Sequence, residues 1–363
     1  MQSNKKNGTS GPVTIKDISS KLNISATSVH RAILGKDGVS DSLRELILAT
    51  ADEMGYERNY VASSIKRKTV RVAVVMPQDQ GLYFEYIWRG LRDYAKEARV
   101  LNVVVEEFVC QDENHQIEIL KQIADAGAKK YAGVVAFSYA GIVKTIIQLT
   151  RLVSMNICTV LIDDERNEID GVYYIPANTQ VIGNMAAELG SLMIPDHGTA
   201  LVSEGRKDSH ILADKISAFT NYMAASKPGI KVKVVSGFVR KAKSETEVYD
   251  SVCKALKENP DTVLYYALTS ADNRIVVQAV KDMGLQNKIR IIATDLNRES
   301  AQFLRNGDVC AVINQGAYAK GYAGLSVVVD SVVKHVAPPK RIDCPIDVVL
   351  RSNLSLYEQS ESL

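Results

Sequence analysis

Polar side chains follow many of the apolar runs in the later part of the 363-residue chain, and carboxylates and amides are frequent among them. Planar carboxylate and amide groups can each hold a pair of sugar hydroxyls. These polar residues are Gln78, Asp79, Ser138, Asp163, Asp164, Glu204, Arg206, Asp272, Asn273, Asp295 and Gln315. Each could instead be a helix cap or a loop residue, because such side chains also favour those positions.

Three aromatic residues follow the first of these apolar runs. Tyr83, Phe84 and Trp88 could supply the flat apolar face against which a sugar ring packs. Trp88 is the only tryptophan in the chain, and burial inside a helix explains it equally well.

A different chemistry is indicated near the N-terminus, where a short helix exposes small and hydrogen-bonding side chains. Its outward positions are Ala26, Thr27, Ser28, His30 and Arg31. Small residues allow close approach to base edges in the DNA major groove, and an arginine such as Arg31 can donate two hydrogen bonds to a guanine. Thr27 can reach a phosphate or a base.

The elements that would position these residues are three short helices with one small core. Thr14, with Asp17 three residues later, predicts a capped helix over 14–22, and Ser25 caps a second over 25–34. Ser40 opens a third helix. Its apolar stripe is expected to consist of Leu43, Leu46, Ile47 and Met54. A helix, a sharp turn and a helix are typical of DNA-binding units, although a plain three-helix domain shows the same pattern.

Strand-like and helical segments alternate after Thr69, beginning with the β-branched run "VRVAVVM" at 70–76. Further strand-like runs lie near 101–108, 132–137, 157–162, 199–203, 231–239, 262–268, 289–294 and 309–313. Alternation of this kind predicts parallel sheets with helices on both faces. The length of this region favours two α/β lobes rather than one sheet.

Charge and cysteine content narrow the function classes. Residues 1–70 hold 11 Lys or Arg against 7 Asp or Glu, a net charge of +4, whereas the rest of the chain has a net charge of −2. A basic end favours a polyanionic partner. The five cysteines are widely spread and unaccompanied by histidine clusters, which predicts reduced, mostly buried thiols and no metal site. No apolar run predicts a membrane helix or a signal peptide.

The N-terminal motifs resemble those of the LacI family of bacterial transcription regulators. The matching pieces are "TIKDI", "ISATSV" followed by Arg31, "GVSDSLRELIL", "GY" at 55–56 and "NYVASSIK" at 59–66, without a gap over 13–67. The resemblance implies a helix-turn-helix DNA-binding domain. It also implies a two-lobed effector domain similar to periplasmic sugar-binding proteins.

The resemblance implies that Ala26, Thr27 and Arg31 read operator bases. His30 stands where the family usually has serine, so it either contacts a phosphate or packs on the helix surface. Ile65 matches an aliphatic residue, usually leucine, that wedges into a central base step; a buried residue at the domain joint is the alternative. The expected DNA-contacting residues are Thr14, Ser25, Ala26, Thr27, Ser28, His30, Arg31, Asn59, Ser64, Ile65 and Lys66.

The segment 59–69 matches the family's hinge helix. Asn59 is a good N-cap and Ile65 shares a face with Val61 and Ala62. Such a segment has only about two turns, too short to be a stable helix alone in water. We therefore expect it to be helical only with DNA and a partner helix.

The resemblance also implies pocket residues in the later segments. "TSADNRIVVQAV" places Asp272 and Asn273 in the cleft, "RIIATDL" places Asp295 and "INQGAYAKG" places Gln315. Lys215 stands where the family often has an arginine. The expected ligand-binding residues are Tyr83, Phe84, Trp88, Ser138, Asp163, Arg206, Lys215, Asp272, Asn273, Asp295 and Gln315.

The expected organisation has five parts. They are an arm at 1–12, a helix-turn-helix domain at 13–58, a hinge at 59–69, a two-lobed effector and dimerisation domain at 70–352, and a tail at 353–363. The expected protein is a cytoplasmic homodimeric regulator, most often a repressor in this family, that binds operator DNA and a sugar or sugar derivative without a cofactor. The ligand could be an inducer or a corepressor.

Two other classes fit the sequence less well. A sugar dehydrogenase on a Rossmann-like fold would need a glycine-rich phosphate loop, and the first strand-to-helix turn lacks G-x-G-x-x-G. A transport binding protein is opposed by the N-terminal DNA-binding pattern.

Overall fold

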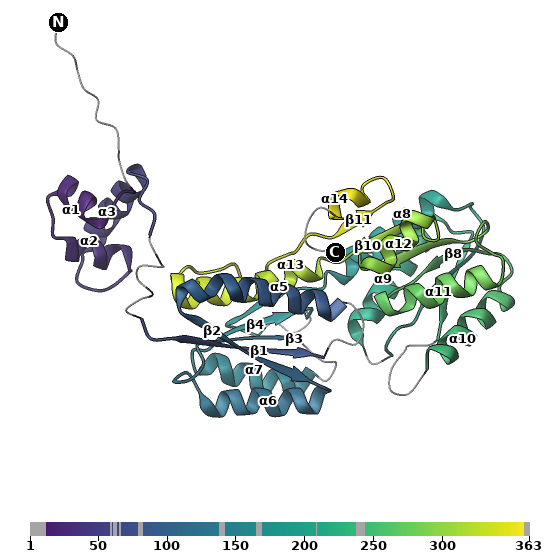
Figure 1. Cartoon of the computed structure of the whole chain (residues 1–363), viewed down its shortest axis with the longest axis horizontal. Coiled ribbons are helices and arrows are strands. Elements are labelled where there is room, and N and C mark those ends of the chain that lie inside the picture. Colours follow the sequence, from purple (N-terminus) through teal and green to yellow (C-terminus); the bar gives the residue numbers. More distant parts are fainter. Residues whose placement is uncertain are drawn as a thin grey trace, which may run out of the picture. The chain divides into compact units, whose positions relative to one another are not determined.

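The computed structural model describes residues 12–58, 60, 64, 67–78, 83–137, 142–164, 169–207, 209–236 and 244–358. The chain divides into two compact units, Met1–Lys68 and Thr69–Leu363. Figure 1 shows helices in the first unit and two lobes, each a sheet with helices against it, in the second.

Residues 12–58 of the N-terminal unit contain three helices close to the predicted ranges, namely α1 (Ile15–Leu22), α2 (Ala26–Ile33) and α3 (Asp41–Glu53). Tyr60 and Ser64 are also helical, although the segment 59–69 was expected to be helical only with DNA. The predicted N-caps are present at all three. Thr14 forms a reciprocal capping box with Asp17, and the hydroxyls of Ser25 and Ser40 accept hydrogen bonds from the first turns of α2 and α3. The caps fix where each helix starts.

The core of this unit is small and consists mainly of aliphatic side chains. Ile18, Val29 and Ile47 are fully buried and bring the three helices together. Leu46 was predicted to face this core, but its side chain is 52% exposed. The stripe of α3 that packs inward continues from Ile47 to Ala51, four residues on, which leaves Leu46 on the solvent side.

The first lobe of the second unit is a five-stranded parallel sheet in the order β2-β1-β3-β4-β5. Its strands are β1 (Val70–Pro77), β2 (Val103–Cys110), β3 (Gly133–Phe137), β4 (Cys158–Ile162) and β5 (Val172–Ile175). Helices α6 (Glu113–Ala126) and α7 (Ile142–Ser154) cover one face. Helices α5 (Tyr83–Ala98) and α13 (Ala317–Val329) lie together on the other face (Figure 1).

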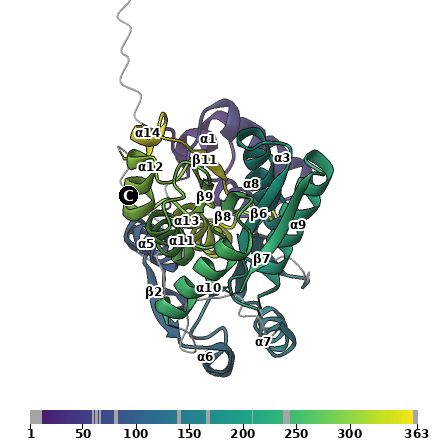
Figure 2. The same ribbon diagram turned by 90° about the vertical axis from the view of Figure 1, so that its right-hand side faces the viewer.

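The second lobe has a six-stranded sheet in the order β11-β10-β9-β8-β6-β7. Its strands are β6 (Gly198–Ser203), β7 (Ile230–Val235), β8 (Thr262–Tyr266), β9 (Arg290–Thr294), β10 (Ala311–Asn314) and β11 (Asp347–Val349). Figure 2 shows helices on both sides of this sheet. One face carries α8 (Thr179–Met193) and α9 (His210–Ser226), and the other carries α10 (Glu245–Glu258), α11 (Ser270–Asp282) and α12 (Arg298–Asn306).

The predicted two-lobed α/β architecture with parallel sheets is therefore confirmed. Two short strands, β5 and β11, were not predicted. Strand β11 also pairs antiparallel with β10, so the second sheet is not wholly parallel. Near the C-terminus, α14 (Leu354–Glu358) is a further short helix.

The chain passes three times between the two lobes, after β5, after β10 and before β11. Strand β5, which leads into the first crossing, is joined to the third crossing by backbone hydrogen bonds from Tyr174 N–H to Lys340 O and from Ile342 N–H to Tyr174 O. The second crossing touches the third at Gly316. A Cβ on Gly316, which has φ +66°, would lie 2.5 Å from Pro345 O.

Glycines bring two pairs of helices into close contact. A Cβ on Gly321 of α13 would lie 2.0 Å from Ile87 O of α5, and one on Gly90 of α5 would lie 2.1 Å from Tyr318 O of α13. In the second lobe, a Cβ on Gly183 of α8 would lie 2.4 Å from Lys215 O of α9. In each lobe, one of the glycine-packed helices follows a crossing and the other follows the first strand of the sheet, so these contacts position the residues near the carboxyl edges of both sheets.

Candidate ligand-binding site

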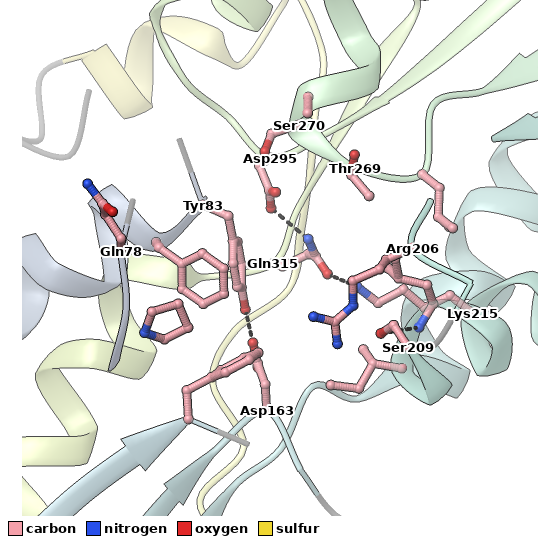
Figure 3. A pocket seen from close by; sticks show the side chains of 17 residues that line it. Gln78, Tyr83, Asp163, Arg206, Ser209, Lys215, Thr269, Ser270, Asp295 and Gln315 are labelled. Carbon is pink, nitrogen blue, oxygen red and sulfur yellow. Dashed lines mark hydrogen bonds between the residues drawn. The ribbon is translucent and has the colours of Figure 1, made fainter. Parts of the chain in front are cut away.

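A cavity of about 170 Å³ lies where the carboxyl ends of strands from both sheets meet (Figure 3). Open α/β sheets bind ligands at this edge. The lining residues are Pro77, Gln78, Tyr83, Phe84, Phe137, Asp163, Arg206, Ser209, Ile211, Leu212, Lys215, Leu268, Thr269, Ser270, Ala271, Asp295 and Gln315. Because residues of both lobes contribute, a bound ligand would contact both.

The wall from the first lobe is largely aromatic. Phe84 meets Phe137 edge to face, with ring centroids 4.9 Å apart, and Tyr83 meets Phe84 in the same way at 5.5 Å. Tyr83 and Phe84 begin α5, and Phe137 ends β3, so the cluster sits directly at the sheet edge. It provides a flat apolar surface of the kind that packs against a sugar ring.

Tyr83 belongs to a buried polar network with Asp163 and Lys320. Its hydroxyl donates to Asp163 Oδ2 at 2.5 Å, and Lys320 Nζ donates to Asp163 Oδ1 at 2.7 Å and to the tyrosine oxygen at 3.1 Å. Lys320 is 1% exposed, and its ion pair with Asp163 compensates both buried charges. The network fixes the orientation of the Asp163 carboxylate beside the cavity.

A second chain of hydrogen bonds lies in the second lobe. Lys215 Nζ donates to Gln315 Oε1, and Gln315 Nε2 donates to Asp295 Oδ1 at 2.7 Å. Both ends of the Gln315 amide are therefore engaged, and its orientation is fixed (Figure 3). Asp295 keeps carboxylate lone pairs for a ligand hydroxyl.

Burial shifts the titration of these groups toward their neutral forms. It raises the pKa of Asp295 to about 6, against the lowering effect of the Gln315 hydrogen bond. It also lowers the pKa of Lys215 to about 8, helped by the nearby Lys320 charge. Burial, followed by the Asp163 charge, raises the pKa of Tyr83 well above its usual range.

Two helices begin at the cavity. The N-cap of α9 is Ser209, whose hydroxyl accepts from Leu212 N–H at 3.4 Å. The N-cap of α11 is Thr269, and Ser270 and Ala271 of its first turn also line the cavity. The partial positive charge of helix N-termini and their free backbone N–H groups favour polar or anionic atoms here.

The structure brings together seven of the predicted ligand-binding residues at the cavity. They are Tyr83, Phe84, Asp163, Arg206, Lys215, Asp295 and Gln315. Ser138 lies outside the described residues.

Three predicted residues do not line the cavity. Trp88 is 4% exposed, and its indole donates to Pro77 O at 3.0 Å, because the turn of α5 directs it into the lobe. The Asp272 carboxylate accepts from Thr269 N–H and hydroxyl in the α11 capping box, at 3.1 and 2.8 Å. The Asn273 amide is occupied by the backbone of Thr294. All three have structural contacts instead.

Sequence reasoning missed some contributors. Lys320 could have been identified from the sequence, because a single lysine inside the apolar helix "AYAKGYAGLSVVV" has to bury its charge. Ser209 and Thr269 could have been noticed as helix caps that follow strands. Phe137 gave no signal, because a strand-ending phenylalanine is usually a core residue.

The predicted DNA-contacting positions of the N-terminal unit are mostly exposed. Ala26, Thr27, His30 and Arg31 are exposed on α2, whereas Ser28 is partly buried. Ser28 hydrogen-bonds to the Ser25 cap.

Thr14 serves the α1 cap. Ser64 is only 5% exposed, so its hydroxyl is not presented to solvent in this structure. Asn59, Ile65 and Lys66 lie outside the described residues.

Within the described parts of the chain, no group of His, Cys, Asp and Glu side chains is arranged to hold a metal ion. The same parts contain no helix whose length and apolar character would suit a membrane span. The five cysteines are thiols rather than disulfides; Cys110 and Cys344 are buried, and Cys158, Cys253 and Cys310 are partly buried.

Comparison with known proteins gives a family and several relatives. Residues 72–334 match the family described as the periplasmic binding protein domain. Catabolite control protein A from Priestia megaterium is 32% identical over 84 residues, which cover 23% of this chain and 25% of that protein. The HTH-type transcriptional regulator RegA from Clostridium saccharobutylicum is 24% identical over 203 residues, 56% of this chain and 55% of that one. The chain thus matches between a quarter and about half of the length of these relatives.

Solved structures support the fold of the second unit. A solute-binding protein from Burkholderia graminis in complex with D-arabinose has a TM-score of 0.71 at 18% identity, covering 80% of this chain and 99% of that one. The glucose-galactose binding protein GanP from Geobacillus stearothermophilus has a TM-score of 0.68 at 18% identity, covering 79% and 99%. The chain belongs to the periplasmic binding protein domain family, and the resemblance to LacI-family regulators that its N-terminal motifs predicted is confirmed.

Proposed function

We propose that the protein is a sequence-specific DNA-binding transcriptional repressor whose affinity for operator DNA is controlled by a sugar or sugar derivative. The observation that carries this proposal is the combination of two units in one chain. One is a capped three-helix unit that exposes Thr27 and Arg31, and the other is a two-lobed unit with a cavity between its sheets that apolar, aromatic and charged side chains line. The working form would be a homodimer that reads two half-sites.

The DNA-binding part of the proposal is supported by the geometry of α2. Val29 and Ala32 are buried and hold one face of α2 against the core, so Ala26, Thr27 and Arg31 face solvent. The Ser25 cap defines the start of the helix. An exposed face with small residues at the start of the helix and an arginine in its last turn suits insertion into the major groove.

The ligand-binding part is supported by the cavity. A ligand that contacts Asp163 in one lobe and Asp295 in the other would stabilise one relative placement of the lobes over others. DNA affinity then changes only if that placement differs in its affinity for the operator. The names of the regulator and sugar-binding relatives agree with both parts.

The test starts from DNA selected by the purified protein out of a random-sequence pool. Fluorescence anisotropy on the enriched sequence then measures affinity with and without a panel of hexoses and pentoses. A palindromic enriched motif and a ligand-dependent change in affinity are expected; a decrease identifies an inducer and an increase a corepressor. Enrichment of no sequence at all would contradict the proposal.

A variant pair separates specific reading from general charge. Arg31→Ala should lower affinity for the selected site by roughly tenfold or more, while binding to random DNA changes little, because base contacts carry discrimination. Lys254→Ala, on α10 and 75% exposed, removes a positive charge far from α2 along the chain and is the control. Ile65→Ala tests the wedge predicted from the sequence in the same assay; equal loss on specific and random DNA would rule that wedge out.

A further inference from the structure

Lys215 has an unusual environment for a buried ammonium group. Its side chain is 4% exposed and lines the cavity. Within the described residues, it hydrogen-bonds to the neutral amide of Gln315 and takes part in no ion pair. A buried charge whose direct contact is a neutral amide is only partly compensated.

The other buried lysine, Lys320, has a different environment. Lys320 is also almost fully buried, but it has Asp163 at 2.7 Å. The carboxylate nearest to Lys215 along the hydrogen-bond chain is Asp295, which lies on the far side of the Gln315 amide. The two lysines are therefore not equivalent, since Lys320 pairs directly with a carboxylate, whereas Lys215 contacts a neutral amide and has the Asp295 and Asp163 charges further away.

Other features of the same wall favour negative charge. Arg206 lines the cavity beside Lys215 (Figure 3). Helices α9 and α11, of 17 and 13 residues, both begin at this wall. Their N-termini contribute partial positive charge, which is the usual setting for bound carboxylates and phosphates.

We propose that the ligand is a small anionic sugar derivative, whose carboxylate or phosphate group supplies the counter-charge of Lys215. This inference rests on the proposed function and specifies the ligand class. The sugar ring would pack against Tyr83, Phe84 and Phe137 of the first lobe. Its anionic group would face Lys215, Arg206 and the N-termini of α9 and α11 in the second lobe. A cavity of about 170 Å³ restricts the ligand to a single sugar unit.

The test compares matched ligands by titration calorimetry on the full-length protein. The panel is glucose, galactose, ribose and arabinose, each beside its terminal phosphate, together with glucuronate and galacturonate. At least one anionic member should bind about 100-fold more tightly than its neutral parent, because charge-assisted hydrogen bonds form in a dry site. The carboxylate and phosphate arms distinguish the two anionic groups.

Three variants locate the effect. Lys215→Gln should lower affinity for the preferred anion by 10- to 100-fold and leave the neutral parent within about threefold. Lys215→Arg keeps the charge and should keep the preference. Lys254→Gln, in the same lobe but outside the cavity, should behave as wild type; circular dichroism checks that each variant is folded.

The outcomes separate the two levels of the proposal. If neutral sugars bind as tightly as their anionic partners, or if Lys215→Gln keeps the anion preference, the anionic class is wrong while sugar control of the protein stands. If no member of the panel binds, the sugar-responsive function itself fails.

Discussion

Asp163 and Asp295 occupy the same place in the two lobes. Asp163 follows β4 and Asp295 follows β9, and both adopt a left-handed backbone, with φ of +65° and +63°. Each backbone N–H donates to an isoleucine carbonyl of the neighbouring strand, Ile175 O at 2.8 Å and Ile313 O at 2.9 Å. The shared geometry turns both carboxylates toward one cavity.

The strand orders of the two sheets also correspond. The order β2-β1-β3-β4-β5 of the first lobe corresponds to β7-β6-β8-β9-β10 of the second. The lobes differ in how the carboxylates are compensated, because Asp163 pairs with Lys320 whereas Asp295 accepts from Gln315. Asp163 thus has its counter-charge in direct contact, whereas Asp295 has a neutral donor.

Lys320→Met should destabilise the protein by about 3–5 kcal/mol, because it leaves Asp163 buried without its counter-charge. Urea unfolding measures the loss. The double variant Lys320→Met with Asp163→Asn should recover much of it. Lys334→Met, which breaks the more exposed pair with Asp330, is the control and should cost less than about 1 kcal/mol. An equal loss of unfolding free energy in the two lysine variants would show that the buried ion pair contributes no more to stability than the exposed one.

Asp295→Asn should lower ligand affinity by roughly 10- to 100-fold and leave ligand-free DNA binding unchanged. Asparagine tolerates the left-handed backbone at this position, so the loss would report on the carboxylate rather than on strain. Titration calorimetry with the tightest sugar and anisotropy with the selected DNA measure the two quantities. A full ligand response in this variant would remove Asp295 from the site.

Gly321→Ala should destabilise the protein by about 2–3 kcal/mol, because its Cβ would meet the backbone oxygen of Ile87 at 2.0 Å and force α5 and α13 apart. Gly324→Ala on the same helix is the matched control. Its Cβ would meet only side-chain carbons, at 3.1 Å, so the change should stay within about 1 kcal/mol. Chemical denaturation compares them, and equal effects would refute the close-packing argument.

Asp272→Asn should change how stability depends on pH. Burial raises the pKa of Asp272 to about 6, so the folded chain holds a proton between pH 4 and 6 that the unfolded chain releases. Wild-type stability due to this group therefore falls as the pH rises through that range.

The variant, which is neutral throughout, should gain on wild type by on the order of 2–3 kcal/mol between pH 4 and 7. Urea unfolding at each pH measures the difference, with the exposed Asp250→Asn as control. A difference that stays constant with pH would contradict the raised pKa.

The sequence predicted most of the fold because burial on both faces makes parallel strands continuous and β-branched, as in β1. It did not reveal β5, whose four residues "VYYI" include two tyrosines, or β11, which has three residues. Runs that short carry too little periodicity, and their strand character comes from pairing with β4 and β10.

The sequence identified residue types that suit a cavity, but it did not show in which direction each side chain points. An aspartate that comes after a strand gives the same sequence pattern in both cases. Its side chain can face a cavity, as that of Asp295 does, or cap a helix, as that of Asp272 does. The spacing of Thr269 and Asp272 was the available clue to the cap. The sequence did not decide whether Trp88 faces the cavity or is buried in the lobe, because the position at which α5 starts determines the side on which the indole lies.

The joined crossings between the lobes have a kinetic consequence. Tyr174 is hydrogen-bonded to the segment at 340–342, and Gly316 lies against Pro345, so the three connections lie next to one another. Adjacent connections of this kind favour a hinge rotation of one lobe against the other. For the proposed ligand, entry and escape would then require these short segments to twist. Residues such as Pro345, which do not line the cavity, would thus affect how long a ligand stays bound.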